Sequence, residues 1–301
     1  MTTLIKQVKV FDTFEECDVY VDDLGATTIA QGIDLDSDIL IDGFDLYALP
    51  SLILPYVKED IKEEVLIKGG FSTVCKEGAI SSFYTKINYH KILSVTSLED
   101  VILADCFLFR LDTHEDVSSI LQAIKQRNGL LLMDYNKELL EVNRSVGCSM
   151  HIMDIDVKEI QNIKEYQTFF PLTCGVKMST LLNEIASYIK WIEEDVIECI
   201  HIDDHYEYAF ALLYTKLVNK RYMSLKQLCK LVAYNIADIF GMDGGEFINY
   251  QENDFFMMNC HVNDRLFSKE FIVLDESLVN EYVNCRIVYH CMKGFVLYNI
   301  I

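Results

Sequence analysis

Two short segments carry the side chains that could do chemistry. "HIMD" holds His151 and Asp154, and "HIDDH" holds the other candidates, His201, Asp203, Asp204 and His205. Imidazole nitrogens and carboxylate oxygens are the ligands that a zinc-type ion takes, so these residues contain enough donors for one water-activating ion. Strand alternation opposes a single site, because His201 and Asp203 would point to one side and Asp204 to the other.

Composition limits the partners that the chain can take. The 301 residues carry a net charge of −21, with 47 acidic side chains against 26 basic ones. A protein that binds nucleic acid or anionic lipid needs clustered lysine and arginine, so we expect neither partner. A small molecule or another protein is the partner that this charge permits.

The start of the chain predicts a cytoplasmic protein without a membrane span. "MTTLIKQVKVFDTF" lacks the basic start and long apolar run of a signal peptide, and no apolar run reaches about 18 residues. The ten cysteines form no C-x-x-C pair. In a cytoplasmic chain we expect such scattered thiols to be small buried side chains, without disulfides.

Three regions follow one another along the chain. Residues 4–47 read as short β-branched strands, and residues 50–241 alternate apolar runs with helical periodicity, which predicts a parallel sheet covered by helices. The best-marked helix begins with a capping box at Ser224 and Gln227 and ends at Gly241. Strand-like runs return afterwards. We therefore predict a composite β domain from residues 1–49 plus 243–301, and one α/β domain over residues 50–242.

Several motifs in this order resemble the dihydroorotase branch of the amidohydrolase superfamily. They are "LPSLILPYVK" near the start, "GGFSTV" at residues 69–74, "VIECIHIDDHY" and "YNIADIFG". The resemblance covers most of the chain and is weak over residues 76–128. It implies a (β/α)8 (TIM) barrel, trimmed or distorted, with a small β domain built from both chain ends.

The resemblance also shows where the family's metal ligands are replaced. Tyr56 and Lys58 stand for the His-x-His pair of the first barrel strand, and Met133 stands where a later strand has histidine. In "HIMD", His151 is retained and Asp154 replaces the second histidine. Asp204, followed by His205, falls on the catalytic aspartate, and Thr173 replaces an arginine of the family.

These replacements predict an inactive protein with no cofactor. A phenol and a protonated amine do not bind a zinc-type ion. A bound metal makes ionisation of water easier by about 12 kcal/mol, whereas a single general base such as Asp204 supplies roughly 3–5 kcal/mol. Asp204, His205 and His151 would then be vestiges of a catalytic site.

Three functions stay open from the sequence. The first is an inactive dihydroorotase-like subunit in pyrimidine biosynthesis whose implied protein partner is aspartate carbamoyltransferase. The second is a cyclic amidohydrolase with a rebuilt one-metal site that holds zinc. The third is a sensor of a pyrimidine intermediate, with Lys58 or Arg110 facing a carboxylate. A homo-oligomer is compatible with all three.

Overall fold

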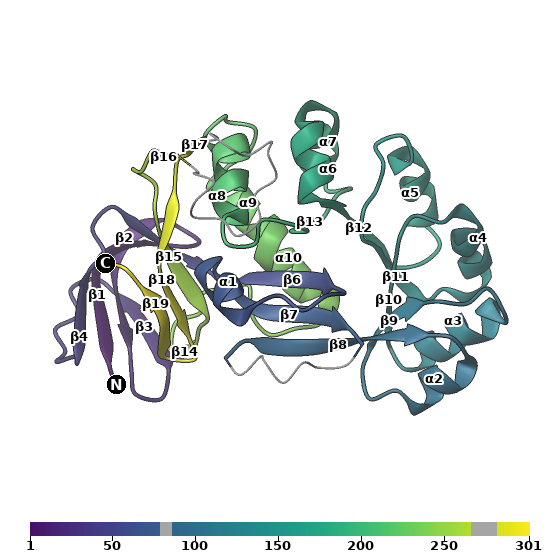
Figure 1. Ribbon diagram of the computed structural model, residues 1–301, viewed down its shortest axis with the longest axis horizontal. Helices are drawn as coiled ribbons and strands as arrows, with labels where there is room; N and C mark the ends of the chain where they lie inside the picture. Colours follow the sequence, from purple (N-terminus) through teal and green to yellow (C-terminus); the bar gives the residue numbers. More distant parts are fainter. Residues whose placement is uncertain (79–85, 266–281) are drawn as a thin grey trace.

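The computed structural model of the protein describes residues 1–78, 86–265 and 282–301. Eight parallel strands form a nearly closed barrel, and Figure 1 shows helices along its outer side. Ladders join the strands in chain order, and β6 and β13, the first and last, contact each other. The strands are β6 (Leu52–Val57), β7 (Phe71–Glu77), β8 (Asn88–Val95), β9 (Leu108–Leu111), β10 (Leu130–Met133), β11 (Ser149–Ile152), β12 (Leu172–Lys177) and β13 (Cys199–His201). The TIM-barrel prediction is confirmed.

Helices follow most of the strands, as the periodicity predicts, and between β7 and β8 residues 79–85 lie outside the described part of the chain. In α3, Ile120, Leu121 and Ile124 form the buried face. The helices are α1 (Glu63–Lys68), α2 (Leu98–Leu103), α3 (Val117–Gln126), α4 (Lys137–Val146), α5 (Ile160–Tyr166), α6 (Met178–Asn183), α7 (Ile185–Glu193), α8 (Ala209–Leu213), α9 (Leu225–Cys229) and α10 (Asn235–Phe240), with π-helical turns η1 (Tyr214–Val218) and η2 (Lys230–Tyr234). The capping box of Ser224 and Gln227 is present, and Gly241 ends α10 with φ of 60°.

Inward and outward side chains of the barrel belong to different apolar clusters. Leu52 and Leu54 pack in the large cluster that includes the outer helices, whereas Ile53 packs in a separate one. That inner cluster also holds Cys75, Leu132 and Cys199 from the strands, and Ile236, Ala237 and Phe240 from α10. Alternation along each strand therefore fills the barrel with apolar side chains, and α10 closes it beside β6 (Figure 1).

A second sheet contains strands from both chain ends. β15 (Phe255–Asn259) pairs with β5 (Leu46–Pro50) on one side and β18 (Arg286–Met292) on the other. The other members are β1 (Thr3–Val10), β2 (Glu15–Val21), β3 (Ala26–Ala30), β4 (Ile39–Asp42), β14 (Gln251–Glu252) and β19 (Phe295–Asn299), while β16 (Asp264–Arg265) and β17 (Tyr282–Val283) form a separate pair. The composite β domain is thus present, and its boundaries at residues 49 and 243 stay a prediction.

The β domain and the barrel share a buried joint. Phe255 and Met257 of β15 face the core of the β domain, whereas Phe256 and Met258 join the barrel cluster. Beside them, His290 of β18 contacts the hydroxyl of Ser51 at 3.0 Å and donates from Nδ1 to the carbonyl of Ile67 at 2.9 Å. The joint is therefore both apolar and hydrogen-bonded.

All ten cysteines are free, and most of them are buried, as the sequence predicts. Among the residues that the structure describes, no helix is both long and apolar enough to cross a bilayer.

Glu198, just before β13, lowers the stability of the folded protein when its carboxyl group is ionised. Burial raises its pKa from 4.5 to about 7, and repulsion from Asp195 and Asp238 adds to the shift. The folded protein binds this proton more tightly than the unfolded chain, so stability is lost as the pH rises from about 4.5 through about 7. We expect Glu198→Gln to raise the free energy of unfolding at pH 8 by about 1 kcal/mol, since solvent screening weakens the effect.

Urea denaturation at pH 5 and pH 8 measures this effect. The exposed Glu193→Gln is the matched control and should change little. An equal gain for Glu198→Gln at both pH values would contradict the assignment.

Candidate functional site

Three buried donor atoms converge inside the barrel. Nε2 of His151 lies 3.0 Å from Nε2 of His201, and Sγ of Cys199 lies 3.4 Å from His201 Nε2 and 3.8 Å from His151 Nε2. His151 comes from β11, and Cys199 and His201 come from β13, where alternation puts both on the same side. The exposed fractions of the three residues are 0%, 0% and 3%. We call these residues the His-Cys-His cluster.

The remaining ring nitrogens of the cluster also have partners. Nδ1 of His201 donates to the carbonyl of Met153 at 2.5 Å, which leaves Nε2 as a lone pair when the ring is neutral. Nδ1 of His151 lies 2.7 Å from the hydroxyl of Thr173. Gly175 makes room for the His201 ring, because a Cβ at residue 175 would lie 2.6 Å from His201 Cε1.

The cluster is uncharged at neutral pH. Burial lowers the pKa of His201 to about 4, and burial together with the neighbouring His201 holds the pKa of His151 well below 6.5. Burial, with Cys174 and Glu198 nearby, raises the pKa of the Cys199 thiol well above 9.0. Two neutral imidazoles and a thiol are donors that fit a zinc-type ion, which takes the sulfur as thiolate.

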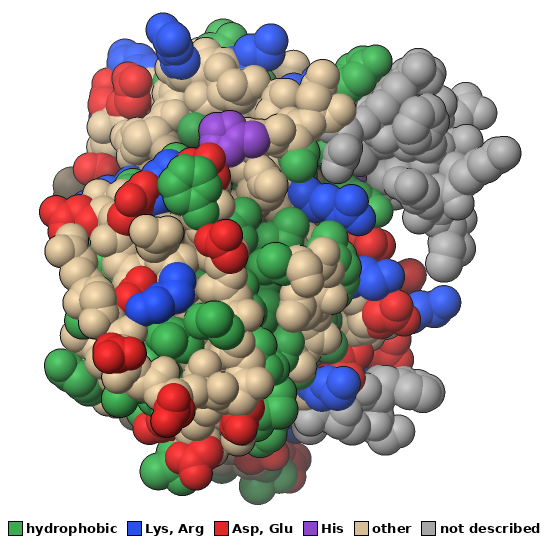
Figure 2. All heavy atoms as spheres, turned by 90° about the vertical axis from the view of Figure 1, so that its left-hand side faces the viewer, with side chains coloured by type: hydrophobic (Ala, Val, Ile, Leu, Met, Phe, Trp, Pro, Cys, Tyr) green, Lys and Arg blue, Asp and Glu red, His purple; other side chains and the backbone are tan. Residues whose placement is uncertain are grey.

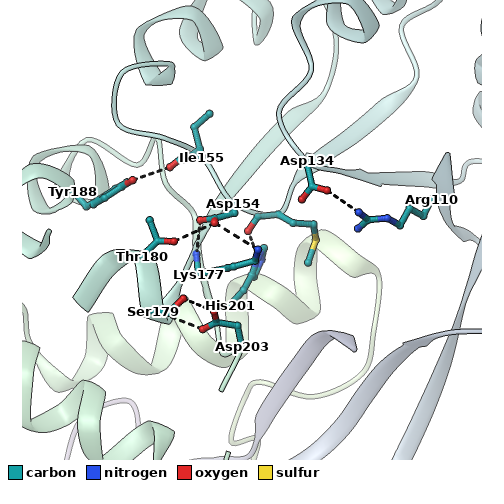
Figure 3. Close-up of polar contacts among 11 residues, drawn as sticks. Arg110, Asp134, Asp154, Ile155, Lys177, Ser179, Thr180, Tyr188, His201 and Asp203 are labelled. Carbon is teal, nitrogen blue, oxygen red and sulfur yellow. Dashed lines mark hydrogen bonds and ion pairs between the residues drawn. The ribbon is translucent and has the colours of Figure 1, made fainter. Parts of the chain in front are cut away.

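The carboxyl ends of the strands form the mouth of the barrel, where enzymes of this fold bind substrate. The hydroxyl of Tyr56 donates to Glu77, and the Arg110 guanidinium lies 5.0 Å from the centre of the Tyr56 ring. Arg110 also pairs with Asp134 at 2.7 Å (Figure 3). Burial and the bond to Glu77 raise the pKa of Tyr56 to about 12.

Asp154 and Asp203 are held on the other side of the mouth. Asp154 accepts the backbone N–H of Lys177 at 3.0 Å and the hydroxyl of Thr180 at 3.1 Å. Asp203 accepts the backbone N–H of Ser179 at 3.1 Å as well as its hydroxyl. Figure 3 shows Asp154 beside Lys177 and Thr180, and Asp203 beside Ser179, with His201 close to both carboxylates.

Asp204, Lys58 and Met133, which the sequence also singles out, are not members of the cluster. Asp204 is 62% exposed and contacts its neighbour His205, at 3.4 Å from His205 Nε2. Lys58 is exposed after β6, and Met133 is buried at the end of β10. Tyr56, Lys58 and Met133 supply neither an imidazole nitrogen nor a carboxylate oxygen, so these three positions do not fit the metal that the family resemblance implies. The six residues proposed for a rebuilt site do not meet as one set, since only His151 and His201 lie in the cluster.

Sequence reasoning misses Cys199, because it predicts the scattered thiols, which form no C-x-x-C pair, to be small buried side chains. The signal was its spacing, because Cys199 and His201 are two residues apart on a strand and so share a face. A cavity of about 830 Å³ lies at the opposite, amino end of the strands and has Asn88, His90, Asp243 and Asp254 in its wall. No mouth residue or cluster residue named above lines it.

Comparison of the sequence with protein-family models and with curated proteins finds no match. Solved structures do match the fold. L-hydantoinase (dihydropyrimidinase) from Arthrobacter aurescens has a TM-score of 0.86 at 13% identity, covering 99% of this chain and 96% of its own. The dihydropyrimidinase of Brevibacillus agri gives 0.84 at 12% identity, covering 99% and 95%. The chain shares the fold of these hydrolases.

A third match is the β-aspartyl dipeptidase from Fervidobacterium islandicum, with a TM-score of 0.70 at 16% identity and coverage of 99% and 97%. These three proteins belong to the amidohydrolase superfamily, which agrees with the superfamily that the motifs resemble. At such low identity the likeness concerns the fold alone. The narrower resemblance to dihydroorotase stays a prediction.

Two aspartates at the mouth should respond differently to loss of charge. We expect Asp154→Asn to lower the free energy of unfolding by about 1 kcal/mol, because Asp154 accepts two hydrogen bonds. Asp204→Asn should stay within about 0.5 kcal/mol of the parent, since that carboxylate is largely exposed. Urea denaturation of both variants checks this, and a larger loss for Asp204→Asn would show that Asp204 has a partner deeper in the barrel.

Proposed function

We propose that this chain is an amidohydrolase-type barrel that binds another protein and does not hydrolyse a cyclic amide. One observation carries the proposal: the polar side chains of the mouth pair with one another. Tyr56 bonds Glu77, Arg110 pairs with Asp134, and Asp154 is held by Lys177 and Thr180. A substrate would have to displace these contacts, and Tyr56, Lys58 and Met133, at three of the family's ligand positions, offer no zinc donor in return.

The partner follows from the family resemblance and the surface. Dihydroorotase-like proteins, active or inactive, can assemble with aspartate carbamoyltransferase, so that enzyme is the partner we propose. Figure 2 views the molecule from the side of the β domain and shows hydrophobic side chains exposed among acidic and basic ones. In that domain Leu24 is 77% exposed and Phe295 is 72% exposed. Exposed apolar side chains of this size suit a protein interface better than they suit water.

Two measurements test this proposal together. The protein, purified from cells grown in medium supplemented with zinc, should hydrolyse hydantoin, dihydrouracil and dihydroorotate no faster than buffer does. Aspartate carbamoyltransferase of the native host should co-purify with it and bind it when both are pure. Zinc-dependent turnover of any of the three compounds would end the pseudoenzyme proposal, and failure of the two pure proteins to associate would end the proposed partnership.

A metal-dependent hydrolase of cyclic amides is the second candidate. Two observations favour it: the fold is shared with proteins named hydantoinase and dihydropyrimidinase, and the His-Cys-His cluster supplies three metal donors. The comparisons support this candidate more strongly, whereas the contacts among the polar side chains at the mouth of the barrel support the first. An ion held by His151, Cys199 and His201 would supply Lewis acidity and a more acidic bound water.

Substitution of His201 separates the two candidates. If the chain is a hydrolase, the protein loaded with zinc turns over a cyclic amide, and His201→Asn removes that activity while aspartate carbamoyltransferase binding is unchanged. If the first proposal holds, neither the parent nor the variant shows turnover.

A further inference from the structure

We propose that His151, Cys199 and His201 form a buried zinc site inside the barrel, one layer below the mouth. The inference does not depend on either candidate function, because an ion at this depth can stabilise the barrel without doing chemistry. It differs from the rebuilt mouth site predicted from the sequence, since Cys199 takes part and Asp154, Asp203, Asp204 and His205 do not.

The distances within the cluster fit a shared ion. Bonds of about 2.0–2.1 Å to nitrogen and about 2.3 Å to sulfur, at tetrahedral angles, separate two nitrogens by about 3.3 Å and nitrogen from sulfur by about 3.6 Å. The observed separations are 3.0 Å between the two Nε2 atoms, and 3.4 Å and 3.8 Å from Sγ to them. Each donor would shift by only a few tenths of an ångström, on the order of the tolerance for a metal site.

The surroundings of the two rings also suit a ligand role. Metal-bound histidines usually donate their other N–H to a carbonyl or hydroxyl, which fixes the tautomer. His201 Nδ1 donates to the carbonyl of Met153, and His151 Nδ1 lies against Thr173, whose hydroxyl is 3.5 Å from the carbonyl of Met150. With Nδ1–H on both rings, both Nε2 atoms carry a lone pair, and the two atoms lie 3.0 Å apart.

In a metal-free cluster, His151 would carry its proton on Nε2 and not on Nδ1. The Thr173 hydroxyl would donate to His151 Nδ1, and His151 Nε2–H would donate to the lone pair of His201 Nε2. These two hydrogen bonds satisfy both rings. They leave Cys199 with only long contacts and no defined role. The tautomer of His151 therefore distinguishes the two states: Nδ1–H with an ion, and Nε2–H without one.

Binding would proceed by proton exchange. The Cys199 S–H bond breaks as the zinc–sulfur bond forms, and the proton passes to solvent, while both imidazoles stay neutral. Because the cluster is buried, the ion is best supplied while the chain folds. Expression in medium supplemented with zinc, or with cobalt as a spectroscopic probe, achieves this.

Elemental analysis of the full-length protein provides the first test. We expect about one zinc per chain in the parent and about a tenth of that or less in Cys199→Ala, because one of three ligands is lost. The cobalt-loaded parent should show a cobalt–thiolate charge-transfer band that Cys199→Ala lacks. Histidine nitrogen NMR should show the Nδ1–H tautomer of His151.

Cys75→Ala is the matched control. Cys75 is equally buried and lies in the same inner cluster, but its sulfur contacts Met242 and not a histidine. This variant should keep the metal content and the cobalt band. Four results would each overturn the proposal. They are parent protein that contains no zinc, copper in place of zinc, equal metal loss in both variants, and the Nε2–H tautomer of His151 in the loaded protein. If Cys199→Ala fails to fold, Cys199→Ser and the tautomer of the parent decide the question.

Discussion

Phe256→Ala should lower the free energy of unfolding by about 3–5 kcal/mol, the usual cost of removing a fully buried phenylalanine. Phe256 is 0% exposed, packs edge-on against Phe210 with ring centres 5.1 Å apart, and covers the backbone at Gly70. It therefore joins the composite sheet to two segments of the barrel. Because Phe255 and Met257 face the other way, the substitution should affect the joint and leave the core of the β domain intact.

Urea denaturation followed by both fluorescence and circular dichroism measures this loss. Phe295→Ala is the control, since that ring lies 72% exposed on the same sheet, and it should change the stability by about 0.5 kcal/mol or less. A loss below about 1 kcal/mol for Phe256→Ala would mean that the joint collapses around the cavity or that it contributes little.

Lowering the pH from 7 to 4 should remove up to about 3 kcal/mol of stability through His290 alone. Burial lowers the pKa of His290 from 6.5 to about 4, although its bond to the carbonyl of Ile67 opposes the shift. The unfolded chain therefore takes up a proton near pH 6.5 and the folded protein does not. The stability that the neutral ring provides is complete above pH 6.5 and is lost as the pH falls through about 4.

Comparison of the parent with His290→Gln isolates this contribution from those of the other histidines. The variant should be less stable at pH 7, because it loses the packing of the ring between Ser51 and Ile67, but its stability should fall less between pH 7 and pH 4. Parallel pH profiles for the two proteins would show that His290 does not titrate in this range.

The fold was predictable because its signals are local. Apolar runs alternating with amphipathic helices predict a parallel sheet, and the capping box at Ser224 marks a helix start that the structure confirms. The dispersed motifs then indicate the barrel and the β domain built from both ends. None of this requires knowing which side chains meet.

The candidate site was predictable only in part because its members come from strands that are not neighbours. β11 and β13 lie on either side of β12, so the contact of His151 with His201 depends on barrel curvature and on the small Gly175 between them. Alternation correctly puts Cys199 and His201 on one face. It fails for Asp203, because the strand ends at His201 and the next residues turn toward Ser179.

The central place of β15 has a consequence for synthesis on the ribosome. β5 emerges about two hundred residues before the strand that hydrogen-bonds its edge, and β1 pairs beside it. Until residue 259 has left the exit tunnel, the nascent chain presents a bare strand edge next to a partly formed barrel. Such edges recruit other chains, so premature termination before β15 should yield aggregates rather than a smaller folded protein.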